Sequence, residues 1–197
     1  GVYFTGDVIY DAVLQNVKIA ERKSRILEGL DLGPKQYLLA TVHRAENTDD
    51  KKRLKYIFDA FLESKEKIVV PLHPRTVKYL KKYRLDNKIK RSKNILLIKP
   101  VGYLDMLKLE KNAKKILTDS GGIQKEAYFL KVPCVTLRDE TEWVETIKDG
   151  WNVLVGANRN KISQAIKGFR PIKKQHKYFG NGNAALKILK AIIRFKR

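Results

Sequence analysis

Cysteine is almost absent from this sequence. Cys134 is the single cysteine among 197 residues, so the chain can form neither an internal disulfide nor a cysteine-based zinc site. It stands in an apolar run, residues 132–135, where a free cysteine behaves as a small buried hydrophobe. A chain without disulfides fits a reducing compartment, so we expect a cytoplasmic protein.

Long hydrophobic runs are missing as well. No apolar stretch approaches the roughly 20 residues that a membrane-spanning helix needs, and no charged-then-apolar leader opens the chain. We therefore expect neither a membrane anchor nor secretion. The chain starts at Gly1, inside an ordered-looking segment with the sequence VYFTGD, and we expect it to be part of a longer protein.

Acidic residues are scarce relative to basic ones. The 42 Lys and Arg against 21 Asp and Glu give a net charge of +21. Such an excess favours anionic partners, among them phosphorylated small molecules, but it is also typical of helix faces solvated by lysine. The basic residues are spread along the chain without a known nucleic-acid motif, so we expect neither nucleic acid nor membrane as a partner. The hydrophobic content of 43% excludes an intrinsically disordered chain.

Six short apolar runs alternate with helical patterns. The runs are residues 37–42, 67–71, 94–98, 115–118, 132–137 and 152–155. The helical patterns are residues 7–29, 49–66, 74–83, 102–112, 121–130, 141–148, a segment from 161, and 184–197. In the first helix, Asp7 is the predicted cap, and the predicted apolar face consists of Val8, Ile9, Ala12, Val13, Val17 and Ala20. The alternation predicts one doubly wound, Rossmann-like α/β domain over residues 1–197, with a parallel sheet of about six strands that binds ligands at its carboxyl edge.

The strongest candidate site is the segment TDSGGIQKEA, residues 118–127. It runs from a predicted strand into a helix, with Gly121 and Gly122 at the junction. Glycines let a ligand approach the backbone, and the free amides at the helix N-terminus suit a phosphate or diphosphate. Ser120 adds a hydroxyl donor, and Glu126 is placed to accept from sugar hydroxyls. The same segment also fits an ordinary tight turn with a helix cap; it is neither a P-loop nor a nucleophile elbow.

Two other loops also follow strands. In TVHRAEN, residues 41–47, His43 and Arg44 can bind an anion and move a proton, or they can be structural loop residues. His73 follows the next strand, and we expect it near His43; two histidines without a third ligand are a poor metal site, so we predict no metal. The segment LRDETEWVE, residues 137–145, joins Arg138 to four carboxylates, including that of Glu142. These carboxylates are either catalytic or the acidic first turn of a helix.

Taken together, these loops resemble a known family. TVHRAEN, the pair His73-Pro74, LTDSGGIQKE and LRDETE occur in this order in the non-hydrolysing UDP-N-acetylglucosamine 2-epimerases, and the resemblance covers about residues 4–155. It implies one half of a two-domain, GT-B-like fold: the C-terminal, UDP-binding half, with an N-terminal catalytic domain as partner and a homodimer as the full enzyme. The family eliminates UDP from a UDP-sugar to give a 2-acetamidoglucal and re-adds it with inverted C2, without NAD.

The resemblance also implies roles for single residues. The implied UDP site consists of His43, Val101, Met106, Ser120, Gly121, Gly122 and Glu126. In it the serine and glycines hold the diphosphate, the glutamate holds the ribose, the valine and methionine contact uracil, and the histidine assists the departure of UDP. Arg44 and His73 are implied contacts to a second, activating UDP-sugar, and Arg138 and Glu142 are candidate phosphate or allosteric contacts.

Three positions depart from the family pattern. Trp143 and Val144 stand where many bacterial members have Arg-Pro, and Lys125 replaces a common Glu. The sequence EWVE also occurs in relatives that epimerise other UDP-sugars, including diacetamido uronic acids. The leading hypothesis is the UDP-binding half of an enzyme that converts UDP-GlcNAc to UDP-ManNAc for surface polysaccharide. The alternatives are an epimerase of another UDP-sugar, or the nucleotide-binding half of a GT-B glycosyltransferase.

Overall fold

Six parallel strands form one sheet in the order β3-β2-β1-β4-β5-β6. The computed structural model describes residues 2–195. The strands are β1 (Tyr37–Thr41), β2 (Lys67–Pro71), β3 (Ile95–Ile98), β4 (Lys115–Thr118), β5 (Cys134–Thr136) and β6 (Asn152–Leu154). Every residue of β1, β4 and β5 is buried, which explains why their sequences do not alternate between polar and apolar side chains. The predicted doubly wound sheet is confirmed.

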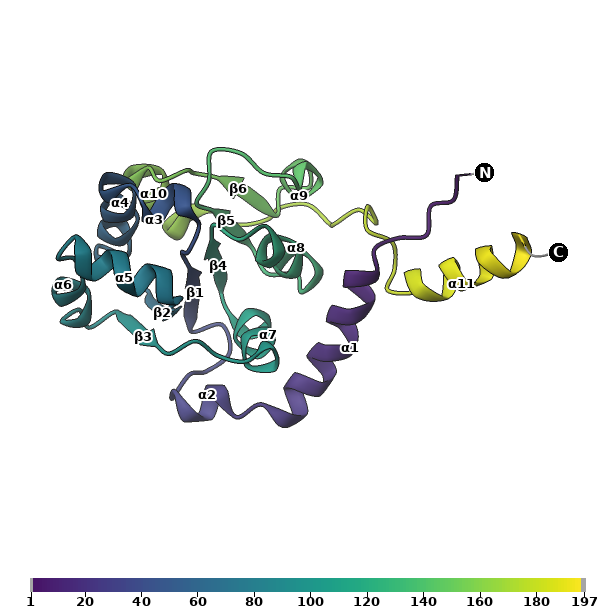
Figure 1. Cartoon of the computed structure of the whole chain (residues 1–197), viewed down its shortest axis with the longest axis horizontal. Coiled ribbons are helices and arrows are strands. Elements are labelled where there is room, and N and C mark those ends of the chain that lie inside the picture. Colours follow the sequence, from purple (N-terminus) through teal and green to yellow (C-terminus); the bar gives the residue numbers. More distant parts are fainter. Residues whose placement is uncertain (1, 196–197) are drawn as a thin grey trace.

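Helices cover both faces of this sheet (Figure 1). They are α1 (Val8–Lys23), α2 (Ile26–Gly29), α3 (Ala45–Thr48), α4 (Lys51–Leu62), α5 (Pro74–Lys82), α6 (Asp86–Lys90), α7 (Tyr103–Asn112), α8 (Gly121–Phe129), α9 (Val144–Lys148), α10 (Arg159–Gly168) and α11 (Ala184–Phe195). None of the helices within residues 2–195 has the length and hydrophobicity needed to cross a bilayer.

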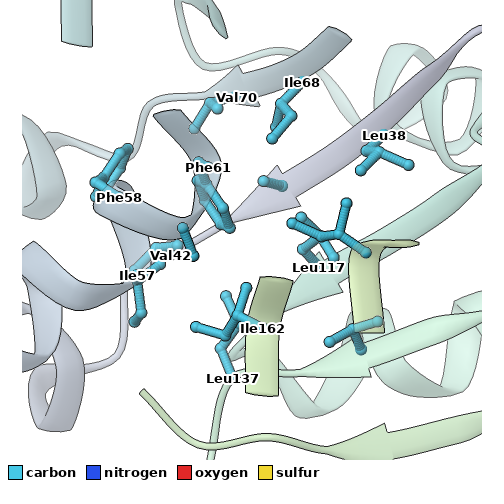
Figure 2. Close-up of a cluster of buried hydrophobic side chains, with 14 of the residues drawn as sticks. Leu38, Val42, Ile57, Phe58, Phe61, Ile68, Val70, Leu117, Leu137 and Ile162 are labelled. Carbon is cyan, nitrogen blue, oxygen red and sulfur yellow. The ribbon is translucent and has the colours of Figure 1, made fainter. Parts of the chain in front are cut away.

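The core is divided by the sheet into two apolar clusters. Leu38 of β1 belongs to the cluster on one face, where Phe58 of α4 and Ile162 of α10 pack (Figure 2). Leu39, the next residue of β1, belongs to the cluster on the other face, which contains Leu107 of α7 and residues of α1 and α8. Successive side chains of a strand point to opposite faces, so β1 anchors both helical layers.

Several helix boundaries differ from the predicted ones. The first helix ends at Lys23 because Ser24 is extended (φ −77°, ψ 133°) and its hydroxyl donates to Asp105 at 2.5 Å. The predicted helix over residues 7–29 is divided into α1 and α2, and the short helices α3 and α6 were not predicted. The predicted helix over residues 49–66 is limited to α4, and α9 begins at Val144 rather than at Thr141. Residues 196–197 of the predicted last helix lie outside the described residues.

The prediction that Val8, Ile9 and Ala12 lie on a buried face of α1 is wrong. All three are exposed, whereas Val13 and Ala20 are buried, because α1 packs on α7 while its first turns extend beyond the sheet beside α11 (Figure 1). Exposed apolar side chains gather on this projection. We call them the apolar terminal face: Val2, Phe4, Val8, Ile9, Leu186, Leu189, Ile192 and Ile193.

Candidate functional site

The strand order places the switch point of the sheet between β1 and β4. From β1 the chain moves outward to β2 and β3, and from β4 it moves outward to β5 and β6. The chain therefore leaves the neighbouring strands β1 and β4 in opposite directions. Doubly wound sheets bind ligands in the crevice that forms between two such loops. His43 and Arg44 follow β1, while Asp119 and Ser120 follow β4. The structure thus brings the two strongest predicted loops together.

Asp119 joins these two loops. Its carboxylate has no exposed surface and accepts the backbone N–H groups of His43 and Arg44, each at 3.0 Å, and the side-chain amide of Asn47 at 3.1 Å. These donors satisfy a buried negative charge and fix the path of the loop after β1. Asp119 was part of the predicted segment, but no role was assigned to it; a carboxylate directly after a buried strand was the available signal.

His43 lies between Asp119 and His73. Its Nδ1 is 3.9 Å from Asp119 Oδ1, and its ring centre is 5.4 Å from that of His73, which confirms that the two histidines are neighbours. Burial lowers the pKa of His43; Asp119 opposes this shift, and His73 and Arg44 add to it. A histidine with a lowered pKa is mainly neutral at pH 7 and can donate or accept a proton there.

The N-terminus of α8 is open to a ligand. Ser120 caps the helix and accepts the N–H of Ile123 at 3.5 Å. Within the described chain, the N–H groups of Gly121 and Gly122 donate to no protein group, as is usual for the first turn of a helix. A β-carbon on Gly122 would meet only the Ser120 hydroxyl, at 3.8 Å. Folding therefore does not require glycine at this position, and the two amides have no partner within the described residues.

Three side chains surround Gly121. A β-carbon there would lie 3.4 Å from Glu142 Oε2, 3.5 Å from Trp143 Nε1 and 3.7 Å from Arg44 Nη2. Glu142 accepts from Arg138 at 2.9 and 3.0 Å, and this hydrogen bonding holds the pKa of Glu142 below its usual range. Because Arg138 is buried and paired with Glu142, the exposed Arg44 supplies the accessible cation beside the helix N-terminus.

Glu126 lies beside the predicted uracil segment. It accepts from the Tyr103 hydroxyl at 3.2 Å, and Tyr103 is flanked by the half-buried Val101 and Met106. Burial raises the pKa of Glu126, while the hydrogen bond from Tyr103 and the neighbouring Glu110 oppose the shift. Glu126, predicted to hold ribose, is therefore joined to the segment that carries the predicted uracil contacts, although the contacts with a nucleotide remain predictions. Glu110 was not singled out from the sequence.

Two of the departures from the family pattern, Lys125 and Trp143, contact each other. Lys125 Nζ lies 4.2 Å from the centre of the Trp143 ring and forms an ion pair with Asp7, the cap of α1. Trp143 Nε1 donates to the backbone carbonyl of Gly121 at 2.8 Å. Lys125 and Trp143 thus link the start of α1 to the start of α8.

Two cavities lie away from this site. One of about 500 Å³ is lined by Tyr128, Phe129 and residues 174–177, and one of about 620 Å³ lies between α4 and α10. Neither is lined by a predicted site residue. Within residues 2–195, no three His, Cys, Asp or Glu side chains are grouped as metal ligands would be.

Comparison with known proteins identifies the family. A family model described as UDP-N-acetylglucosamine 2-epimerase matches residues 1–193. A UDP-N-acetylglucosamine 2-epimerase homolog from Methanococcus maripaludis is 59% identical over 194 residues, which are 98% of this chain and 54% of the relative. The UDP-2,3-diacetamido-2,3-dideoxy-D-glucuronate 2-epimerase of Pseudomonas aeruginosa is 43% identical over 157 residues, 77% of this chain and 43% of the relative.

A solved structure agrees with these sequence matches. The crystal structure of UDP-GlcNAc 2-epimerase from Methanocaldococcus jannaschii, in complex with UDP-GlcNAc and UDP, has a TM-score of 0.87 and 44% identity; the match covers 98% of this chain and 54% of that one. The chain spans about half the length of the curated relatives that it matches. The match to the family model extends over nearly the whole sequence, and the chain therefore belongs to the UDP-N-acetylglucosamine 2-epimerase family.

Proposed function

We propose that this chain is the UDP-binding half of a UDP-GlcNAc 2-epimerase. The observation that carries the proposal is the open N-terminus of α8, where the free amides of Gly121 and Gly122 lie beside Ser120 and the exposed Arg44. Amides, a hydroxyl and a guanidinium are donors suited to a diphosphate. A family member, the M. jannaschii enzyme, has been solved with UDP-GlcNAc and UDP.

The proposed reaction moves one proton and one leaving group. A base removes the proton at C2 of the sugar, the bond between C1 and the UDP oxygen breaks, and UDP leaves as the 2-acetamidoglucal forms. UDP then adds back to C1, and C2 receives a proton on the opposite face. Neither the elimination nor the addition transfers a hydride, so the proposal contains no step for NAD, and it assigns no step to a metal.

The residues of this chain suit the leaving-group side of that reaction. The amides at the start of α8 and the Arg44 guanidinium stabilise the negative charge that develops on the departing diphosphate. His43, mainly neutral at pH 7 because burial lowers its pKa, exchanges a proton with it. In the proposal Glu126 holds the ribose hydroxyls, Val101 and Met106 contact uracil, and His73 lies with Arg44 at a second UDP-sugar.

A second domain completes the proposed enzyme. The chain spans about half of its relatives, and the apolar terminal face projects from the sheet. Exposed apolar patches of this kind mark interaction surfaces. We place an N-terminal catalytic domain there, and this domain supplies the base that removes the proton from C2. We further propose that the complete enzyme is a homodimer in the cytoplasm.

A second UDP-sugar is a candidate substrate. The P. aeruginosa relative that acts on a UDP-diacetamido glucuronate is 43% identical over 157 residues, and this chain has the EWVE sequence, residues 142–145, in place of the commoner Arg-Pro form. A UDP-diacetamido uronic acid is therefore the alternative substrate. The family match over residues 1–193 favours either epimerase over a glycosyltransferase.

Calorimetric titration tests the proposed nucleotide site. We expect the chain to bind UDP more tightly than ADP, and Glu126→Ala to weaken UDP binding by tenfold or more, since a hydrogen bond to a charged group contributes about 1.5–3 kcal/mol. Equal affinities for the two nucleotides, or an unchanged affinity in Glu126→Ala, would contradict the proposal. Epimerisation of UDP-GlcNAc and of the diacetamido uronate should appear only when the N-terminal half is added, and the preferred sugar then identifies the substrate.

A further inference from the structure

Glu110 is a carboxyl group buried inside the domain, on α7, the helix that packs on α8 and whose Tyr103 donates to Glu126. It lies in the last turns of α7 and has no exposed surface. Among the described residues, no N–H or O–H group donates to either of its side-chain oxygens. A carboxylate in such a place would be neither solvated nor hydrogen-bonded, and this is a costly state for a charge.

The titratable groups near Glu110 provide no counter-charge. They are Glu126 on α8, Tyr103 at the start of α7, Tyr37 on β1 and Cys134 on β5. The Tyr37 hydroxyl donates to the backbone carbonyl of Leu109 at 2.7 Å, so it is not available to Glu110. None of these neighbours is a cation. The site therefore favours a neutral, protonated Glu110.

Glu126 differs from Glu110 in its access to solvent. Its side chain is only partly buried and accepts from the Tyr103 hydroxyl at 3.2 Å. Burial, and next the charge of Glu126, raise the pKa of Glu110 well above its ordinary value. Of the two adjacent carboxyl groups, Glu126 is the one that carries the negative charge and Glu110 the one that holds a proton.

We infer that Glu110 is a positioning residue that donates a hydrogen bond to Glu126 and so aims Glu126 at two neighbouring hydroxyl groups of a ribose. A carboxylate has about four acceptor positions. Tyr103 and Glu110 occupy two of them, and two remain for a vicinal diol. The inference rests on the proposed function for the identity of the ligand, a uridine nucleotide.

Two substitutions of Glu110 distinguish the effect of its hydrogen-bond donor from the effect of filling a buried space. Glu110→Gln keeps the size and an N–H donor, whereas Glu110→Leu keeps an apolar volume and removes the donor. If Glu110 loses its proton at high pH, the donor becomes a second negative charge beside Glu126. Preference for the diol is then lost as the pH rises in the native chain, but not in Glu110→Gln.

The first measurement concerns the ligand-free chain. With ¹³C-labelled glutamate, the carboxyl resonances are followed by NMR from acidic to alkaline pH. We expect one glutamate to remain protonated at pH 7, and its resonance to be missing in Glu110→Gln. If every glutamate carboxyl is ionised at pH 7, the inference is overturned, whatever the affinity for UDP.

The second measurement compares the affinities of UDP and 2′-deoxy-UDP. We expect the native chain to prefer UDP about tenfold or more, Glu110→Leu to lose this preference, and Glu110→Gln to restore it. An unchanged preference in a folded Glu110→Leu overturns the positioning role. If the native chain binds neither nucleotide, the proposed function fails for this chain, and the NMR titration still decides whether Glu110 carries the proton.

Discussion

Lys125 Nζ lies 4.2 Å from the centre of the Trp143 ring. These residues stand at two of the three positions where the sequence departs from the family pattern, so these two departures are not independent. Lys125 is buried and pairs with Asp7, while Trp143 donates to the carbonyl of Gly121. The pair holds the first turn of α8 against the start of α1.

Reversing the charge at position 125 tests this coupling. Lys125→Glu leaves a buried carboxylate beside Asp7, and we expect it to lower the free energy of unfolding by about 3 kcal/mol. The double variant Lys125→Glu/Trp143→Arg should recover part of the loss, because the arginine provides a cation at the same place. Urea unfolding measures both, with the exposed Lys18→Glu as control. Strictly additive effects would show that the two positions are not coupled.

Removing the charge of Asp119 should loosen the loop after β1. In Asp119→Asn an NH₂ group replaces one of the two carboxylate oxygens that accept from the N–H groups of His43 and Arg44. One acceptor is lost, and the new NH₂ donor faces a backbone N–H donor. We expect a loss of about 2–4 kcal/mol in unfolding free energy and faster hydrogen exchange at both amides. The control Asp139→Asn, whose side chain is 67% exposed, should change stability by less than about 0.5 kcal/mol. Equal stability of the two variants would refute this role.

The lowered pKa of His43 predicts a pH dependence of stability. An unfolded histidine titrates near pH 6.5, whereas burial lowers the pKa of His43 in the folded chain. As the pH falls through this window, the unfolded chain binds the proton first, so the free energy of unfolding decreases. The decrease should be smaller in His43→Gln. An NMR titration of His43 with a midpoint above pH 6.5 would contradict the assignment.

Gly122 should be dispensable for folding but not for nucleotide binding. Alanine has the higher helix propensity, so Gly122→Ala should leave stability unchanged or raise it by up to about 1 kcal/mol. Its methyl group enters the space above the free amides and should weaken UDP binding about tenfold or more. Gly168→Ala, in α10, is the matched control, since a β-carbon there contacts nothing. UDP affinity that is equally unaffected in both variants would place the diphosphate elsewhere.

The sheet was predictable because its strands are nearly continuous apolar runs. All five residues of β1 are buried, and a run of this kind bounded by turns is typical of a central parallel strand. The exposure of Val8 and Ile9 was not predictable, because their spacing fits a buried helix face. Whether such a face is covered depends on how far α1 extends beyond the sheet, and this is a property of the tertiary structure.

The candidate site was predictable as separate segments, not as a network. The sequence identified Ser120, Gly121 and Glu126 because a strand followed by two glycines and a helix has a local signature. The roles of Asp119 and Glu110 depend on burial by distant segments: Asp119 is covered by residues more than 70 positions away. Contacts at such separations leave no periodicity in a single sequence.

The central claim is that the N-terminus of α8 binds the diphosphate of UDP. Backbone ¹H–¹⁵N NMR of the chain during a titration with UDP, with uridine as control, tests it most directly. We predict that the amide resonances of Gly121 and Gly122 shift most with UDP and stay in place with uridine, which lacks the diphosphate. No shift at these two amides, or shifts gathered instead around the cavity at Tyr128 and Phe129, would contradict the claim.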